Sequence, residues 1–173
     1  MVQVRVGGVA LDAAGQHVLL LKPLDMPPGE GRILPVWIGA LEATSILVAV
    51  EGAEVPRPLA HDLMGDILRS LGGELERAEV TRIDDGTYYA QLTVRSPVGV
   101  RLVDARPSDA VALASRLSAP IWVADDVMEE AGVSDILESG GESDEQVDEA
   151  PPEEKLDEFR RFLEDVDPED FRE

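Results

Sequence analysis

The chain has 173 residues, of which 36 are acidic and 15 basic, and its net charge is −21. It contains no cysteine and two histidines, which excludes disulfides, thiolate metal sites and cysteine nucleophiles and argues against a histidine-rich zinc site. Residues 138–173 hold 16 of the acidic and 4 of the basic residues, and the rest of the chain is acidic too. We therefore do not expect the broad basic surface with which proteins grip nucleic acid.

No apolar run approaches the roughly 20 residues that a helix needs to span a bilayer. The first residues already alternate like a strand and lack the organisation of a signal peptide. We expect a cytoplasmic protein without membrane contact.

The N-terminal third predicts three strands. Apolar residues alternate over 2–13, and Gly7-Gly8 interrupts them where a bulge or a close approach would fit. Residues 17–22 form the second strand of a hairpin, and residues 33–38 a third, apolar strand.

Two helices are predicted next. Residues 40–50 are nearly all apolar and Gly52 closes the helix, so we expect it to be buried on most sides or packed between subunits. The second helix begins near Leu59 and ends at Gly72-Gly73. One apolar stripe runs along it, made of Leu59, Leu63, Met64, Ile67, Leu68 and Leu71. His61 lies off this stripe, so we expect solvent to reach it.

The following part predicts strands over 74–83 and 87–95, joined by a hairpin turn at Asp84-Asp85-Gly86. A further strand leads into a helix that begins at Pro107, and a short strand over 120–124 precedes a final helix that Asp125 caps. Hairpins without strict strand–helix alternation favour an α+β fold with a largely antiparallel or mixed sheet and several packed helices.

The domain organisation follows from composition. Residues 1–137 form the predicted single domain, and residues 138–152 change to Glu, Asp, Ser, Gly and Pro, which is typical of a disordered acidic linker. Residues 153–173 carry a weak amphipathic pattern and predict a short C-terminal helix and tail, which docks on the domain or awaits a protein partner.

Two polar clusters carry the candidate chemistry. Asp104, Arg106, Ser108 and Asp109 surround the strand-to-helix junction at Pro107. Paired carboxylates suit Mg²⁺ or Mn²⁺, and a guanidinium can clamp phosphate, although an ordinary capped helix with an Arg–Asp ion pair explains the same residues.

The second cluster lies at the start of the predicted helix near Leu59. There His61 could move protons beside Asp62 and Arg57, or these residues are only a solvated first turn. Glu42 is a lone carboxylate in the apolar helix, where the helix dipole alone would favour it.

The chain from about Val2 to Gly132 resembles the bifunctional nuclease domain family. The segments that carry this resemblance are Leu34-Pro35-Val36-Trp37-Ile38-Gly39, Glu42-Ala43, Glu51-Gly52, Pro56-Arg57-Pro58, His61-Asp62-Leu63, Asp85-Gly86-Thr87-Tyr88-Tyr89-Ala90 and Val103-Asp104-Ala105-Arg106-Pro107-Ser108-Asp109-Ala110. The end of the chain, with Phe159-Arg160-Arg161-Phe162-Leu163 and Pro168-Glu169-Asp170-Phe171, is similar to the ending of actinobacterial members.

The resemblance implies hydrolysis of RNA and DNA, an α+β fold and homo-oligomers. It makes the motif positions candidates. The catalytic candidates are Glu42, His61, Asp62, Asp104 and Asp109, and the substrate-binding candidates are Arg57, Arg106 and Ser108.

The leading hypothesis is a metal-assisted phosphodiesterase. Asp62, Asp104 and Asp109 would hold Mg²⁺ or Mn²⁺ and His61 would move protons. This requires His61 to lie within reach of the 104–109 junction. The alternative is a non-catalytic homo-oligomeric interaction module whose acidic tail recruits a protein partner.

Overall fold

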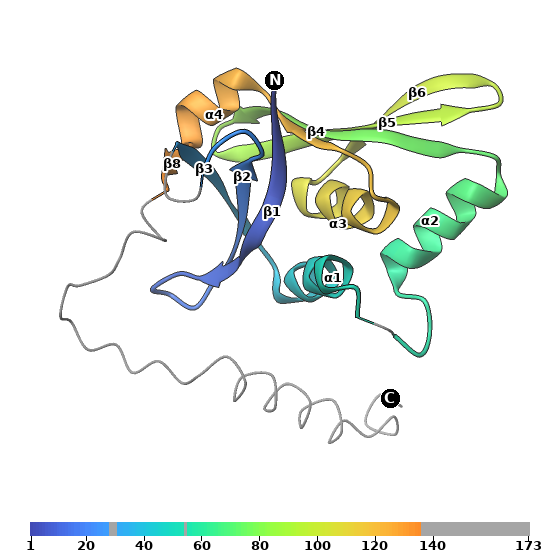
Figure 1. The fold of residues 1–173 in the computed structure, drawn as a ribbon, viewed down its shortest axis with the longest axis horizontal. Helices are drawn as coiled ribbons and strands as arrows, with labels where there is room; N and C mark the ends of the chain where they lie inside the picture. The colour runs from blue at the N-terminus through green and yellow to red at the C-terminus, as the bar shows by residue number, and fades with distance from the viewer. Residues whose placement is uncertain (28–30, 54, 136–173) are drawn as a thin grey trace. The chain divides into compact units, whose positions relative to one another are not determined.

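The computed structural model describes residues 1–27, 31–53 and 55–135. Their eight strands form one sheet in the order β6-β5-β4-β7-β1-β2-β3-β8 (Figure 1). The strands are β1 (Val2–Leu11), β2 (His17–Pro23), β3 (Arg32–Ile38), β4 (Glu74–Asp84), β5 (Thr87–Ser96), β6 (Gly99–Ala105), β7 (Ile121–Val123) and β8 (Val133–Ser134).

The N-terminal part of the sheet is an antiparallel meander of β1, β2 and β3, and its β1–β2 hairpin was predicted. The register between β1 and β2 shifts between Val6 and Gly8, which confirms the interruption expected at the glycine pair. A side chain at Gly7 would collide with the aliphatic part of Lys22, 2.7 Å away. This close approach explains why a glycine stands there.

The second part of the sheet contains the β4–β5 hairpin. Asp85 and Gly86 both have positive φ, 47° and 74°, as a two-residue hairpin turn of the primed type requires. The short strand β7 pairs parallel with β4 and antiparallel with β1, and thereby joins the two parts. The sheet is mixed and mostly antiparallel, so the predicted α+β class is confirmed.

Four helices accompany the sheet: α1 (Ala40–Glu51), α2 (Ala60–Ser70), α3 (Pro107–Leu117) and α4 (Asp125–Ala131). The α3 helix packs on β4 and β5, and both α1 and α2 pack on α3 (Figure 1). Ala110 to Ala114 of α3 are all buried and belong to the same hydrophobic core as Leu19, Leu34 and Val80. The central position of α3 places its first turn beside the other two helices.

The α2 helix faces the opposite way from the one we predicted. Most of its apolar stripe is exposed, with exposed fractions of 54% for Leu63, 50% for Ile67 and 73% for Leu71. His61, in contrast, is buried, with an exposed fraction of 7%. The reason is local to Gly65: a side chain there would meet Leu117 of α3 at 3.0 Å, so α2 uses its glycine side to approach α3 closely. The expectation that solvent reaches His61 freely is therefore wrong.

The α1 helix is also less buried than its composition suggests. Within the described chain Ala43 and Ile46 are its buried residues, and Leu41 is 85% exposed. Burial on most sides, one of the two arrangements predicted for this helix, is not observed here. Its predicted end is confirmed, because Gly52 caps it in the left-handed conformation.

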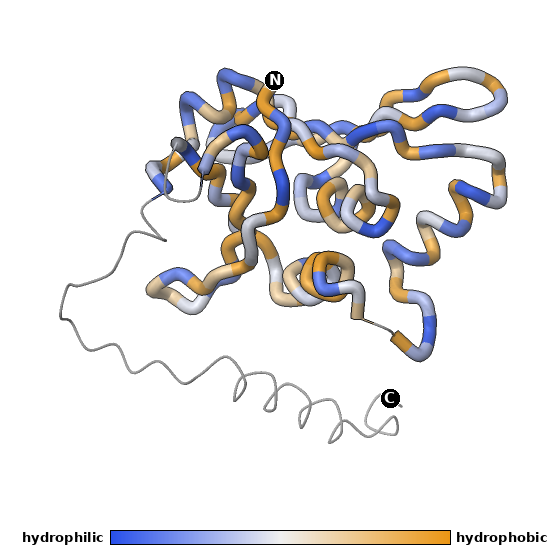
Figure 2. The backbone as a smooth tube through the Cα atoms, viewed as in Figure 1, coloured by the Kyte–Doolittle hydropathy of each residue, from blue (hydrophilic) through white to orange (hydrophobic). Residues whose placement is uncertain are grey.

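Figure 2 shows apolar segments along α2 and around the β5–β6 turn at the periphery of the fold.

The final helix differs slightly from prediction, because Ala124 rather than Asp125 is its N-cap residue. None of the helices in the described ranges is long and apolar enough to cross a membrane. The predicted linker over 138–152 and helix and tail over 153–173 lie outside the described residues.

Candidate functional site

The beginnings of α1, α2 and α3 supply a connected set of polar side chains. Pro107 opens α3 and leaves Arg106 extended at the N-cap position, with φ −70° and ψ 146°. Asp109 and Glu42 lie in the first turns of α3 and α1, where the helix dipole favours a carboxylate. Packing of α1 and α2 against α3 brings these turns together (Figure 1).

Arg106 joins two carboxylates from different helices. Its Nε donates to Asp109 Oδ2 at 2.8 Å and its Nη2 to Asp109 Oδ1 at 3.1 Å, a bidentate pair. Its Nη1 donates to Glu42 Oε1 at 2.9 Å. The hydrogen bonds and the charge of Asp109, followed by those of Glu42, raise the pKa of Arg106 above its usual value. The Arg106 side chain is 66% exposed, so the guanidinium lies at the outer edge of this cluster.

His61 lies on the inner side, with hydrogen-bond partners at both ring nitrogens. Its Nε2 is 3.3 Å from Asp109 Oδ1 and its Nδ1 is 2.8 Å from the hydroxyl oxygen of Ser45 on α1. The imidazole side chain is only 9% exposed. A carboxylate only accepts hydrogen bonds, so in the neutral ring the proton belongs on Nε2 and Nδ1 accepts from the serine.

Asp109 links the arginine and the histidine. Burial by itself would raise the pKa of this carboxyl, but the hydrogen bonds and charge of Arg106, with a smaller contribution from His61, outweigh burial and lower the pKa. Asp109 is therefore an ionised acceptor at neutral pH, able to orient the imidazole and to stabilise a positive charge on it.

A second, more deeply buried ion pair supports the set. Arg116 of α3 is 6% exposed, and its Nε donates to Asp62 Oδ1 at 2.7 Å. Its Nη1 donates to the backbone carbonyl of Ser45 at 2.7 Å. The other oxygen of Asp62 accepts from the backbone N–H of Leu59 at 2.8 Å, at the start of α2. Arg116 thus fixes α1 and α2 against α3 beside His61.

Gly39 gives Glu42 its orientation. A side chain at this N-cap position of α1 would lie 2.3 Å from Glu42 Oε2. The carboxylate therefore folds back over the glycine, where it reaches Arg106. This close contact gives a physical reason for the Ile38-Gly39 ending of β3 before the helix.

The structure thus joins Glu42, His61, Arg106 and Asp109, with Asp62 alongside, from the predicted residues. The required closeness of His61 to the 104–109 junction is met through Asp109. Three predicted residues lie outside this network. Asp104 is exposed on β6 opposite Gln91, and Arg57 is exposed before α2. Ser108 is buried in the first turn of α3, with an exposed fraction of 7%.

The three predicted metal ligands do not form a cluster. Across residues 1–27, 31–53 and 55–135, no three His, Asp or Glu side chains are grouped as for a metal ion. Asp62 and Asp109 instead form ion pairs with Arg116 and Arg106. The arrangement of these residues therefore does not fit the predicted set of metal ligands.

Sequence reasoning missed Ser45 and Arg116. Ser45 is one of the few polar residues in a mostly apolar helical pattern, and Arg116 lies in the last turn of a helix of mainly small residues. A buried arginine needs an anionic or carbonyl partner. Its presence in an apolar helix is the signal that could have pointed to an internal ion pair.

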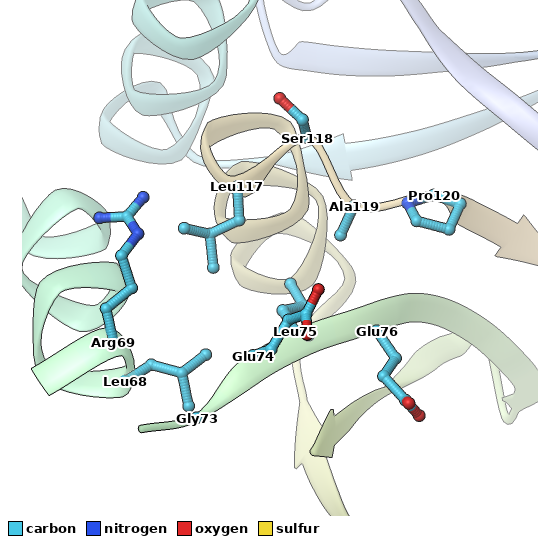
Figure 3. Close-up of a pocket in the computed structure, with 10 residues that line it drawn as sticks. All are labelled: Leu68, Arg69, Gly73, Glu74, Leu75, Glu76, Leu117, Ser118, Ala119 and Pro120. Carbon is cyan, nitrogen blue, oxygen red and sulfur yellow. The ribbon is translucent and has the colours of Figure 1, made fainter. Parts of the chain in front are cut away.

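The hollow shown in Figure 3 is a different place. It has a volume of about 240 Å³ and lies between the end of α2, the start of β4 and the turn after α3. Leu68, Leu75 and Leu117 form its apolar part, and Arg69, Glu74 and Glu76 its charged rim. None of the predicted site residues lines it.

Comparison with known proteins agrees with the sequence resemblance. The model of the bifunctional nuclease domain matches residues 24–135. An uncharacterized protein of Mycobacterium tuberculosis strain H37Rv is 39% identical over 173 residues, which is 99% of each chain. Bifunctional nuclease 1 of Arabidopsis thaliana is 30% identical over 121 residues, and bifunctional nuclease 1 of Oryza sativa subsp. japonica is 25% identical over 115.

The plant matches cover 68% and 65% of this chain but only 36% and 34% of the plant proteins. The shared part contains every helix that contributes to the network of Arg106, Asp109 and His61. The chain therefore belongs to the bifunctional nuclease domain family.

Proposed function

We propose that this protein hydrolyses phosphodiester bonds in RNA and DNA at the cluster of Glu42, His61, Arg106 and Asp109. The observation that carries the proposal is that one carboxylate, Asp109, binds both the exposed guanidinium of Arg106 and the imidazole of the buried His61. A phosphate held by this arginine would be next to a group that can move protons. The names of the plant relatives agree with this activity.

Arg106 is suited to phosphate even though it already binds two carboxylates. A guanidinium has five N–H groups, and three of them donate to Asp109 and Glu42. Two N–H groups therefore remain for a phosphate oxygen, on a side chain that is 66% exposed. The carboxylates fix the fork so that little side-chain entropy is lost on binding.

The acidity of the chain is not uniform near this cluster. The stretch from residue 57 to 116, which contains α2, β4 to β6 and α3, has eight basic and nine acidic residues. The strongly acidic part is the last 36 residues, which carry a net charge of −12. This stretch therefore lacks the strong negative charge of the C-terminal segment, and this supports the proposal.

The expected requirement for Mg²⁺ or Mn²⁺ stays a prediction. The contacts of Asp62 and Asp109 favour arginine as their counter-ion over a metal. A chelator arm in the activity assay decides this independently of the residue assignments.

The test is cleavage of fluorescent single-stranded RNA and DNA oligonucleotides by wild type, His61→Ala, Arg106→Gln and Arg5→Gln. Arg5 is the matched control because it is an exposed arginine on β1, a strand that contributes to neither the cluster nor the proposed interface. We expect His61→Ala and Arg106→Gln to lose at least about 100-fold in kcat/KM and Arg5→Gln to keep wild-type activity. No cleavage by wild type with Mg²⁺, Mn²⁺ or chelator would refute the proposal.

We also propose that a second copy of the chain covers the exposed apolar face of α2. This face ends beside the β5–β6 turn, because a Cβ at Gly72 would lie 3.2 Å from Pro97. The neighbours of these two residues in sequence, Leu71 and Val98, are 73% and 78% exposed. β6 is a sheet edge whose apolar residues are exposed. In this arrangement β6 pairs antiparallel with β6 of the second copy, so that Leu102 of one copy lies opposite Val103 of the other. The same register places Arg101 of each copy opposite Asp104 of the other. A protein partner for the C-terminal segment remains the alternative.

A further inference from the structure

We propose that Ser45 is the nucleophile of this site and forms a covalent phosphoserine intermediate. The inference rests on the proposed hydrolysis of phosphodiesters and deepens it. It starts from the surroundings of His61, whose Nδ1 is 2.8 Å from Ser45 Oγ and whose Nε2 is 3.3 Å from Asp109. Both ring nitrogens are therefore engaged by protein groups, and the ring is 9% exposed.

This arrangement decides what His61 can deprotonate. A general base must lie within hydrogen-bond reach of the proton that it removes. Asp109 occupies the Nε2 side, and the group at Nδ1 is the Ser45 hydroxyl. A water molecule would have to displace one of these partners, whereas the serine already has the distance and the proton. Nucleophile, base and orienting carboxylate thus stand in sequence, as in other activated serines.

The supporting contacts hold the serine in place. Its backbone carbonyl accepts from buried Arg116 at 2.7 Å, so the α1 backbone at this position is tied to α3. Ser45 itself is partly exposed, and Arg106, bound to the same Asp109, presents its free N–H groups to solvent. Asp109 thus connects Arg106, which would bind the phosphate, with His61, which binds the Ser45 hydroxyl.

The expected substrate range agrees with an enzyme nucleophile. DNA lacks the 2′-hydroxyl that RNA carries, so a nuclease that cuts both cannot use this group to attack the phosphorus. The nucleophile must come from water or from the protein. Ser45 Oγ is a protein nucleophile that treats the two polymers alike.

The reaction balances in two displacements. In the first, the Ser45 proton passes to His61 Nδ1, Oγ bonds to phosphorus, and the phosphorus–oxygen bond to the leaving nucleoside breaks. The leaving oxygen takes the proton from the imidazolium. In the second, water gives a proton to His61 and attacks phosphorus, the Oγ–phosphorus bond breaks, and Oγ regains the proton. The products are an alcohol and a phosphomonoester, and no redox partner is needed.

The test compares full-length wild type, Ser45→Ala and Thr44→Ala on RNA and DNA oligonucleotides. Thr44 is the matched control, because it neighbours Ser45 in α1 and its hydroxyl donates to the Ala40 carbonyl at 3.0 Å. Circular dichroism confirms folding of each variant. We expect Ser45→Ala to lose at least about 1,000-fold in kcat, Thr44→Ala to stay within threefold of wild type, and acid-quenched wild type to carry a nucleotide on Ser45 by mass spectrometry.

A second readout needs no variant. Cleavage of a phosphorothioate linkage of one configuration in water labelled with a heavy oxygen isotope gives a product that is chiral at phosphorus, with net retention after two displacements and inversion after direct attack by water. Inversion, or a Ser45→Ala variant as active as wild type, overturns the covalent role while the nuclease proposal stands. Absence of cleavage by wild type overturns both.

Discussion

Replacing Arg116 by methionine should destabilise the fold far more than replacing another ion-paired arginine on the same group of helices. Methionine keeps much of the aliphatic volume but removes the donors to Asp62 and to the Ser45 carbonyl, both at 2.7 Å. The control is Arg69→Met, because Arg69 pairs with Asp66 at 2.8 Å and both side chains are 59% exposed.

The magnitude follows from burial. Removing one partner of a buried pair costs about 3–5 kcal/mol, since the other charge is left without compensation. Asp62 is 29% exposed and water can solvate it in part, so we expect about 3 kcal/mol, at the lower end. An exposed pair contributes about 0.2–1 kcal/mol. The two variants should therefore differ by about 2 kcal/mol or more in their free energy of unfolding.

Urea unfolding followed by circular dichroism measures this difference. We expect equal slopes of free energy against urea concentration and a clearly lower midpoint for Arg116→Met. Equal midpoints for the two variants would refute the assignment of Arg116 as the residue that ties α1 and α2 to α3. A changed slope would show that the variant altered compactness instead.

The pH dependence gives a second check on the same pair. Burial would raise the pKa of Asp62, but the Leu59 N–H bond, the bond and charge of Arg116, and the charge of His61 lower it. A carboxyl whose pKa is lower in the folded than in the unfolded protein stabilises the fold at a pH above its unfolded-state pKa, near 3.9. This stabilisation is lost as the pH falls through the lower pKa of the folded state. The difference in free energy of unfolding between wild type and Arg116→Met should therefore become smaller below about pH 4. It should not vanish, because the hydrogen bond to the Ser45 carbonyl does not depend on pH.

Three further predictions concern the site and its surroundings. Asp109→Asn should lower the oligonucleotide kcat by about 100-fold or more with the fold retained by circular dichroism; unchanged kcat would separate Asp109 from the chemistry. Gly39→Ala should displace the Glu42 carboxylate, 2.3 Å from the added carbon, and lower kcat/KM about tenfold with little change in Tm; a large loss of Tm would contradict a purely local effect. Leu63→Glu should convert an oligomer to monomer by light scattering, whereas Leu11→Glu, at a similarly exposed leucine on β1, should not; a monomeric wild type would exclude the α2 interface.

Much of the site could be predicted because its residues lie in motifs that begin helices. Pro107 places Arg106 and Asp109 at a helix start whatever surrounds them, and the pairing of Arg106 with Asp109 is local in the chain. The bond from Arg106 to Glu42 spans 64 residues, and that from His61 to Asp109 spans 48. No spacing rule fixes such contacts, so their partners could not be assigned.

Ser45 and Arg116 show the limit most clearly. Each looks like an incidental polar residue in an apolar helix, and each acquires a role only through a partner on another helix. The predicted set of metal ligands reflects the same limit. Carboxylates grouped in sequence suggested a shared cation, whereas the fold gives Asp62 and Asp109 an arginine each.

Sequence alone determined seven of the eight described strands, their turns and the ends of most helices, because hairpin glycines, Pro107 and Gly52 act through local backbone geometry. The two-residue strand β8 was not predicted, and the N-cap of α4 is Ala124 rather than the predicted Asp125. It also determined that α2 is amphipathic. Only the tertiary structure decided which face of α2 is buried, because close approach to Leu117 requires the space at Gly65 and turns His61 inward. The apolar periodicity of a helix specifies a stripe that avoids water, but the element that covers this stripe depends on which neighbours the fold supplies.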